Sequence, residues 1–232
     1  MREENDLLEI QARIPAGDAV LDGVLAMPSG ATGIAVFAHG SGSSRRSPRN
    51  MSVARIIRNA GVGTLLFDLL TREEESVDVF TRSLRFNIEL LTARLIDATR
   101  WLAGQEETRD LPIGYFGSST GAAAALMAAA KLSENIGAVV SRGGRPDLAG
   151  DALPMVKAPT LLIVGGHDEL VIELNQDAYA RLRCEKDLRV IPGATHLFEE
   201  PGALEQVADF AAAWFKKRLQ SLPAHKKAAG GL

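Results

Sequence analysis

The chain has 232 residues, of which 46 % are hydrophobic and 24 % charged, and its 26 Lys and Arg against 29 Asp and Glu give a formal net charge of −3. These values are typical of globular proteins and exclude extensive disorder, and the charge excludes the basic surface that binds nucleic acid or acidic membranes. The single cysteine excludes an intrachain disulfide framework and a cysteine-rich zinc site.

The N-terminus is polar and is not followed by an apolar stretch with a small-residue cleavage signal, so we expect no secretory leader and a cytoplasmic location. The most apolar run, Ala122–Ala130, is nine residues long, less than half of what a membrane-spanning helix requires. We therefore expect no membrane association.

The first elements along the chain form an antiparallel pair. Residues Leu7–Met27 contain two stretches of alternating character separated by the turn-forming residues Pro15–Asp18, which predicts a hairpin at a sheet edge. Short, mostly apolar runs then recur, as expected of parallel strands buried on both faces. The six predicted strands are Ile34–Ala38, Gly63–Phe67, Pro112–Phe116, Gly137–Val140, Thr160–Val164 and Leu188–Ile191.

Segments of helical periodicity separate these runs, with apolar residues every three or four positions. They are Asn50–Ala60, Ser83–Ala103, Gly121–Lys131, Glu173–Leu182 and Leu204–Leu219. The alternation predicts an α/β fold with a mostly parallel sheet covered by helices on both faces. We predict one domain over residues 1–222 and a frayed tail over 223–232. The polar segment Leu69–Arg82 is the main candidate to border a pocket.

The strongest chemical motif is Gly117–Gly121, which has the pattern G-x-S-x-G between a predicted strand and a predicted helix. A sharp strand-to-helix turn of this kind exposes the central serine above the sheet, so Ser119 is the candidate nucleophile. Small residues on either side let the strand and helix approach closely. The alternative is an ordinary turn with a helix cap. Ser118 lies one residue off the pattern and should point elsewhere.

A serine nucleophile requires a base, and the base requires a carboxylate that orients it. Asp168 follows the strand Thr160–Val164, and His196 follows the last predicted strand, so both lie in the expected chain order after the serine. We assign them as acid and base. Asp168 could instead cap the next helix, with Glu169 as the substitute acid, and His196 could be a solvated surface residue. For His167, which adjoins the acid, a structural role is expected.

The glycine-rich loop His39–Arg45 lacks both common phosphate-binding patterns, which disfavours a nucleotide site. In serine hydrolases the corresponding loop supplies one backbone amide of the oxyanion hole, and the residue after the nucleophile supplies the other. We assign these roles to Ser41, with Gly42 as the nearby substitute, and to Thr120. His39 is expected to be a buried scaffold residue.

Four arginines lie in loops expected at the carboxyl ends of the strands, where ligands bind in open α/β sheets: Arg45, Arg46, Arg142 and Arg145. Arg45 and Arg142, together with Gly42, are therefore possible substrate-binding residues, and the arginines could attract a carboxylate-bearing substrate. The alternative is that they are solvated or paired with acidic neighbours. No histidine and carboxylate set has metal-ligand spacing, and we expect no metal and no organic cofactor.

Taken together, these motifs resemble those of the α/β-hydrolase superfamily, and within it the dienelactone-hydrolase-like branch. The resemblance covers nearly the whole chain and rests on His39–Ser43, Gly117–Gly121, Gly165–Asp168 and Gly193–Phe198, and on the lack of a long insertion. It implies an α/β-hydrolase fold with an antiparallel N-terminal edge and a minimal cap. The stretches Ser141–Leu148 and around His196 are similar to hydrolase domains that occur fused to a phosphoribosyltransferase.

One departure bears on the expected reaction. Dienelactone hydrolase itself has cysteine at the elbow, whereas this chain has Ser119, so lactone specificity does not follow. We predict hydrolysis of small to medium carboxylic esters through an acyl-enzyme. Lactone or dienelactone hydrolysis is the alternative within enzymes, and a non-catalytic binding domain is the alternative outside them. The natural substrate, chain-length preference and oligomeric state stay open.

Overall fold

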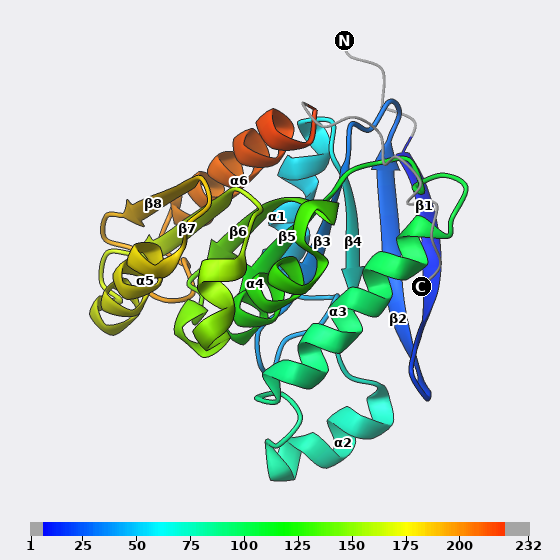
Figure 1. Cartoon of the computed structure of the whole chain (residues 1–232), viewed down its shortest axis with the longest axis horizontal. Helices are drawn as coiled ribbons and strands as arrows, with labels where there is room; N and C mark the ends of the chain where they lie inside the picture. Colours follow the sequence, from blue (N-terminus) through cyan, green and yellow to red (C-terminus); the bar gives the residue numbers. More distant parts are fainter. Residues whose placement is uncertain (1–6, 221–232) are drawn as a thin grey trace.

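The computed structural model describes residues 7–220 and contains one eight-stranded sheet with the order β1-β2-β4-β3-β5-β6-β7-β8 (Figure 1). The strands are β1 (Leu7–Ala16), β2 (Ala19–Pro28), β3 (Ile34–Ala38), β4 (Gly63–Phe67), β5 (Ile113–Ser118), β6 (Ile136–Arg142), β7 (Thr160–Gly165) and β8 (Lys186–Ile191). β1 and β2 pair with each other, and β2 with β4, in antiparallel fashion, and all other pairs are parallel. The predicted edge hairpin and parallel sheet are confirmed.

Helices cover both faces of the sheet because each central strand is apolar on both sides. One core lies under α1 (Pro48–Asn59) and α6 (Ala203–Leu219), and the other under α3 (Ile88–Ala103), α4 (Thr120–Leu132) and α5 (Glu169–Arg181). Along β3 the side chains alternate between the two cores, with Phe37 in the first and Val36 in the second. None of the helices within residues 7–220 is long and apolar enough to cross a membrane.

The structure corrects the expectation that the last strand is buried. β8 is the outer strand of the sheet, and of its residues only Ile191 is buried. The apolar positions Leu188 and Val190 suggested a central strand, but a strand with a neighbour on one side alone keeps much of its surface in water. β5 and β6 each extend two residues beyond their predicted carboxyl ends, to Ser118 and Arg142.

The polar segment between β4 and α3 forms a helix that the periodicity did not predict. α2 (Arg72–Thr81) begins in a capping box, in which the Thr71 hydroxyl accepts from the Glu74 amide and the Glu74 carboxylate accepts from the Thr71 amide. α3 consequently begins at Ile88 rather than at Ser83. Figure 1 shows α2 beyond the carboxyl end of β4, apart from the layers that cover the sheet.

Three smaller differences concern helical boundaries. α5 begins at Glu169, four residues before the predicted start. Two short 3-10 segments, η1 (Ser133–Asn135) and η2 (Pro146–Met155), flank β6 and were not predicted. The predicted tail over 223–232 lies outside the described residues.

Candidate active site

Ser119 sits on a strained turn between β5 and α4. Its φ is 49° and its ψ is −121°, a backbone conformation that residues other than glycine rarely adopt. The turn is possible only with glycine on both sides: a Cβ at Gly117 would lie 2.4 Å from the Cα of Ala122, and a Cβ at Gly121 would lie 2.1 Å from the carbonyl oxygen of Ala38. The sequence pattern therefore encodes this geometry directly.

Backbone hydrogen bonds hold the turn in place. The amide of Ser119 donates to the carbonyl of Arg142 over 3.3 Å, and its carbonyl accepts from the amide of Arg145 over 3.0 Å. Ser119 is partly exposed, whereas Ser118 is 2 % exposed and its hydroxyl is buried without a hydrogen bond. The two adjacent serines thus differ as the pattern predicts, and of the two only Ser119 is accessible to solvent.

Asp168 and His196 are brought together by two neighbouring strands. Their loops follow β7 and β8, and the His196 Nδ1 lies 2.6 Å from the Asp168 Oδ2. The two loops are also joined through their backbones, since the His167 amide donates to the Ala194 carbonyl over 2.9 Å. Asp168 occupies the N-cap position of α5, but its side chain makes no capping bond. Its carboxylate is directed at the imidazole, which removes the helix-cap alternative, and Glu169 does not take its place.

The loop after β6 connects the histidine to the serine. Gly143, with φ of 50°, lies so close to His196 that a Cβ there would be 3.1 Å from the His196 carbonyl oxygen and 3.5 Å from Nδ1. The preceding residue, Arg142, accepts the Ser119 amide hydrogen bond. Ser119, Asp168 and His196 therefore border one region at the carboxyl edge of the sheet. The Ser119 hydroxyl is not hydrogen-bonded to the ring, and in ligand-free sites such bonds often tighten only when substrate binds.

The segment after His196 anchors the histidine loop. Phe198 is 1 % exposed and has a φ of 56°. Its ring packs against Gly143. The Thr195 amide donates to the Glu200 carboxylate over 3.0 Å. The Thr195 side chain, and to a smaller extent backbone amides, lower the pKa of Glu200. Together these contacts hold the loop on both sides of the imidazole.

His39 fixes the loop predicted to bind the oxyanion. Its Nε2 accepts from the Leu69 amide over 3.0 Å, which places the proton on Nδ1, 2.9 Å from the Gly40 carbonyl. Burial lowers the pKa of His39, so the ring is neutral near pH 7. The expected scaffold role for His39 agrees with this arrangement, which leaves neither ring nitrogen for proton transfer.

The two predicted oxyanion donors lie beside each other, but one is engaged. The Ser41 amide donates to the Thr120 hydroxyl over 3.1 Å. The amides of Gly42 and Thr120 have no hydrogen-bond partner within residues 7–220. The Gly42 amide, named as the substitute, is therefore more available than the Ser41 amide, and the Thr120 side chain has a role that the sequence did not reveal.

The arginines singled out as possible substrate-binding residues are placed differently from that expectation. Arg45 is bonded to Asp68 through both its backbone amide, at 2.7 Å, and its guanidinium, which also lies 3.8 Å from Asp22. Arg142 is 8 % exposed and lies at the end of β6. The alternative that these arginines pair with acidic neighbours therefore fits Arg45. Arg142 fits neither expectation, because it is buried.

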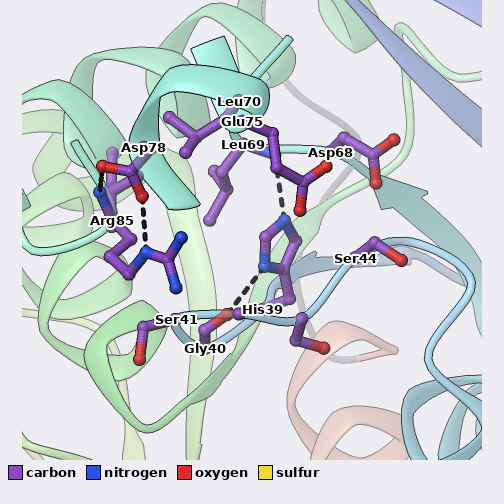
Figure 2. Close-up of a pocket in the computed structure, with 13 residues that line it drawn as sticks. His39, Gly40, Ser41, Ser44, Asp68, Leu69, Leu70, Glu75, Asp78 and Arg85 are labelled. Carbon is purple, nitrogen blue, oxygen red and sulfur yellow. Dashed lines mark hydrogen bonds and ion pairs between the residues drawn. The ribbon is translucent and has the colours of Figure 1, made fainter. Parts of the chain in front are cut away.

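A pocket borders the oxyanion loop (Figure 2). Opposite this loop it is closed by α2 and by Arg85 in the segment after α2. It is lined by residues 39–44 and 68–70 and by Glu75, Asp78, Arg85 and Leu91. Asp78, whose side chain is fully buried, accepts from the Arg85 Nε over 2.5 Å. Burial alone would raise the pKa of Asp78, but bonds from Arg85 and two backbone amides lower it. The expectation that Leu69–Arg82 borders a pocket is confirmed, whereas Arg85 was missed because it lies just beyond that segment.

No group of three or more His, Cys, Asp or Glu side chains in the described part of the chain could hold a metal ion. Cys184, the lone cysteine, is partly buried near the start of β7, where its thiol contacts the Thr160 hydroxyl.

A family profile and a solved structure point to the same family. The profile of the dienelactone hydrolase family matches residues 21–224. The solved dienelactone hydrolase from Anabaena variabilis is 57 % identical, covers 92 % of this chain and 99 % of its own length, and superposes with a TM-score of 0.90. Est1E from Butyrivibrio proteoclasticus is 16 % identical over 90 % of this chain and 98 % of its own, with a TM-score of 0.75, and shares the fold.

Two curated relatives, from two strains of Mycobacterium tuberculosis, are each named as a candidate phosphoribosyl transferase. They are 59 % identical over 209 residues, which is 90 % of this chain and 46 % of the relative. The chain thus spans about half the length of these curated relatives. With the family profile matching most of the chain and the site residues in the order that the fold requires, the protein belongs to the dienelactone hydrolase family.

Proposed function

We propose that this hydrolase cleaves carboxylic esters with Ser119 as nucleophile, His196 as general base and Asp168 as the carboxylate that orients the base. The observation that carries the proposal is the 2.6 Å bond between Asp168 and His196 at the same sheet edge as the strained turn of Ser119. A binding domain has no need for a carboxylate that gives up its helix-capping position to orient an imidazole.

The reaction begins when the Ser119 oxygen attacks the ester carbonyl carbon and His196 takes the hydroxyl proton. The bond to the alcohol oxygen then breaks, and the alcohol leaves with the proton from His196. In the second half His196 takes a proton from water as the water oxygen attacks the acyl carbon. The bond between that carbon and the Ser119 oxygen then breaks, His196 returns the proton to the Ser119 oxygen, and the carboxylic acid is released. Asp168 stabilises the imidazolium formed in each half without itself taking the proton.

Backbone amides stabilise the negative oxygen of each tetrahedral intermediate. The Thr120 amide at the start of α4 is one donor, and the loop after β3 supplies the second. Because the Ser41 amide donates to the Thr120 hydroxyl, either this bond is exchanged for one to the oxyanion or the unbonded Gly42 amide serves instead. Loss of one such donor costs about 100- to 1,000-fold in rate.

We propose that part of the substrate occupies the pocket of Figure 2, which borders the oxyanion loop but is not lined by Ser119, Asp168 or His196, and that its lining favours substrates without a negative charge. Asp68, Glu75 and Asp78 line it, and Arg85 is the one cation among the lining residues. Arg85 is compensated by Asp78, and Arg45 by Asp68, so neither offers an unpaired charge to a carboxylate. We therefore propose neutral esters of small to medium size. A lactone is a cyclic ester, and the same residues would open one.

The test is a panel of p-nitrophenyl esters of graded chain length, run with wild type, Ser119→Ala and Ser118→Ala. Loss of turnover is expected for Ser119→Ala alone, because the Ser118 hydroxyl is buried. A fluorophosphonate should label wild type at Ser119. Equal loss in both variants would mean that the nucleophile is misassigned, and a wild type inert to every ester, lactone and fluorophosphonate would favour the binding-domain alternative.

A further inference from the structure

Arg142 is an arginine with no partner in the interior of the molecule. It is 8 % exposed, its Nη1 is fully buried without a hydrogen bond, and no acidic side chain among residues 7–220 forms an ion pair with it. Burying an unpaired charge is among the most costly features a protein can contain. A residue that destabilises the fold in this way is a candidate for a functional role.

The charged group that acts on Arg142 is another cation and not a counter-charge. The side chain lies on the α1 and α6 face of the sheet, the same face as Val140 two residues earlier. The charged group that acts on it from α1 is a second cation, Arg49, which is itself 2.7 Å from Glu199. Burial, with a smaller contribution from Arg49, lowers the pKa of Arg142 to about 10, so the guanidinium stays charged near neutral pH.

This charge is one strand away from the nucleophile. Arg142 is paired in register with Ser118, the residue before the nucleophile, and its carbonyl accepts the Ser119 amide. The hydroxyl of Ser118, which also points into the interior, is buried without a partner. The buried Nη1 end of the guanidinium therefore lies in a poorly solvated region, on the strand next to the one that leads into the turn of Ser119, where charges interact more strongly than in water.

We propose that Arg142 acts as a fixed positive charge behind Ser119 that stabilises the negative charge developing on the substrate during acylation and deacylation. The inference rests on the proposed esterase function. An acidic partner at Arg142 would cancel this field, and among residues 7–220 none forms an ion pair with it. The charge stabilises the neutral ester only slightly in the ground state, whereas it stabilises the oxyanion strongly. We therefore expect Arg142 to raise kcat and to leave KM nearly unchanged.

The test compares Arg142→Met and Arg142→Lys with wild type, using p-nitrophenyl acetate turnover and thermal unfolding. For Arg142→Met we expect kcat to fall about 10- to 100-fold with little change in KM, while the unfolding midpoint stays equal or rises. Arg142→Lys keeps the charge and should recover a substantial part of kcat. Fluorophosphonate labelling at Ser119 should slow in parallel, because negative charge also develops in that reaction.

Arg94 provides a matched control for stability. It is 5 % exposed, as buried as Arg142, but it is bonded to both carboxylate oxygens of Glu74 and to the Leu69 carbonyl. Arg94→Met should therefore lower the unfolding midpoint, in contrast to Arg142→Met.

Two outcomes would overturn the inference while wild-type activity left the esterase proposal intact. They are an unchanged kcat in Arg142→Met, whether or not KM rises, and a lysine variant as slow as the methionine variant. A wild type without esterase or labelling activity would overturn both proposals together.

Discussion

At the scale of single residues, the site depends on two residues in locally unfavourable states, one without its usual capping hydrogen bond and one with a strained backbone. Asp168 stands at the N-cap of α5, where an aspartate normally accepts a backbone amide, yet its carboxylate is bonded to His196. Ser119 likewise occupies a left-handed conformation that costs about 1 to 3 kcal/mol. In both cases local stability is lower than it could be, and the gain is a defined geometry at the sheet edge.

The orienting role of Asp168 leads to a prediction about rate. Asp168→Asn should lower kcat by about 10⁴-fold, because the amide favours the wrong tautomer of His196 and cannot stabilise the imidazolium. Circular dichroism should remain that of wild type, since the carboxylate makes no capping bond. Glu169→Gln is the matched control and should keep near wild-type kcat. The reverse ranking of the two variants would reassign the acid.

At the scale of elements, α2 illustrates how a polar segment becomes ordered. Few residues of α2 are buried, so hydrophobic burial contributes little to its stability. The helix is held in place by its capping box and by the buried Asp78 side chain. Glu74 serves twice, since its carboxylate caps α2 and also binds Arg94 on α3. The pattern Thr-x-x-Glu at Thr71 was a visible sequence signal for this start. The ion pair to Arg94, by contrast, joins residues twenty positions apart and has no local signature.

The Glu74 carboxylate should make stability depend on pH. Its bond with Arg94 holds the pKa of Glu74 below its usual value. The stabilisation is therefore complete above the unfolded pKa of about 4.3 and is lost as pH falls through the lower folded pKa. Glu74→Gln, which can keep the capping bond, should cost about 1 to 3 kcal/mol of unfolding free energy near pH 7.

Urea unfolding of wild type and Glu74→Gln between pH 7 and pH 3 measures this difference. The gap between the two proteins should be constant above about pH 5 and should shrink at lower pH. A gap that stays the same down to pH 3 would show that the carboxylate charge is not the source of the stabilisation.

At the scale of the whole molecule, two hydrophobic cores share one sheet. Each central strand contributes alternate side chains to both cores, so neither core can lose its packing without exposing the other face of the same strands. The sequence analysis predicted one domain over residues 1–222, and this shared sheet leads us to expect one cooperative unfolding transition.

The chain's two tryptophans allow a direct test, since one lies in each layer. Trp101 is in α3 and packs against one core, and Trp214 is in α6, where its indole donates to the Pro159 carbonyl over 3.3 Å. In Trp101→Phe the fluorescence reports on α6, and in Trp214→Phe it reports on α3. Each fluorescence midpoint in urea should coincide with the circular dichroism midpoint of the same variant. Separate midpoints would contradict a single folding unit.

Much of the site could be predicted because its residues are constrained locally. The strained turn requires glycine on both sides of Ser119, the strands that precede Asp168 and His196 are short apolar runs, and the parallel order brings their ends to one edge. The same local reasoning failed for β8, because the exposure of a strand depends on whether a neighbour lies beside it, and this is a property of the sheet rather than of the strand.

By itself the sequence determined the α/β architecture and the antiparallel edge, and it predicted the three residues of the proposed site, because apolar periodicity and glycine spacing act over a few residues. Only the tertiary structure decided which charges are compensated. Arg45 is paired with Asp68, and Arg142 is left alone in the interior, although both looked alike as loop arginines. The energy of a charge depends on the solvent and partners around it, and these are set by chain segments that are distant in sequence.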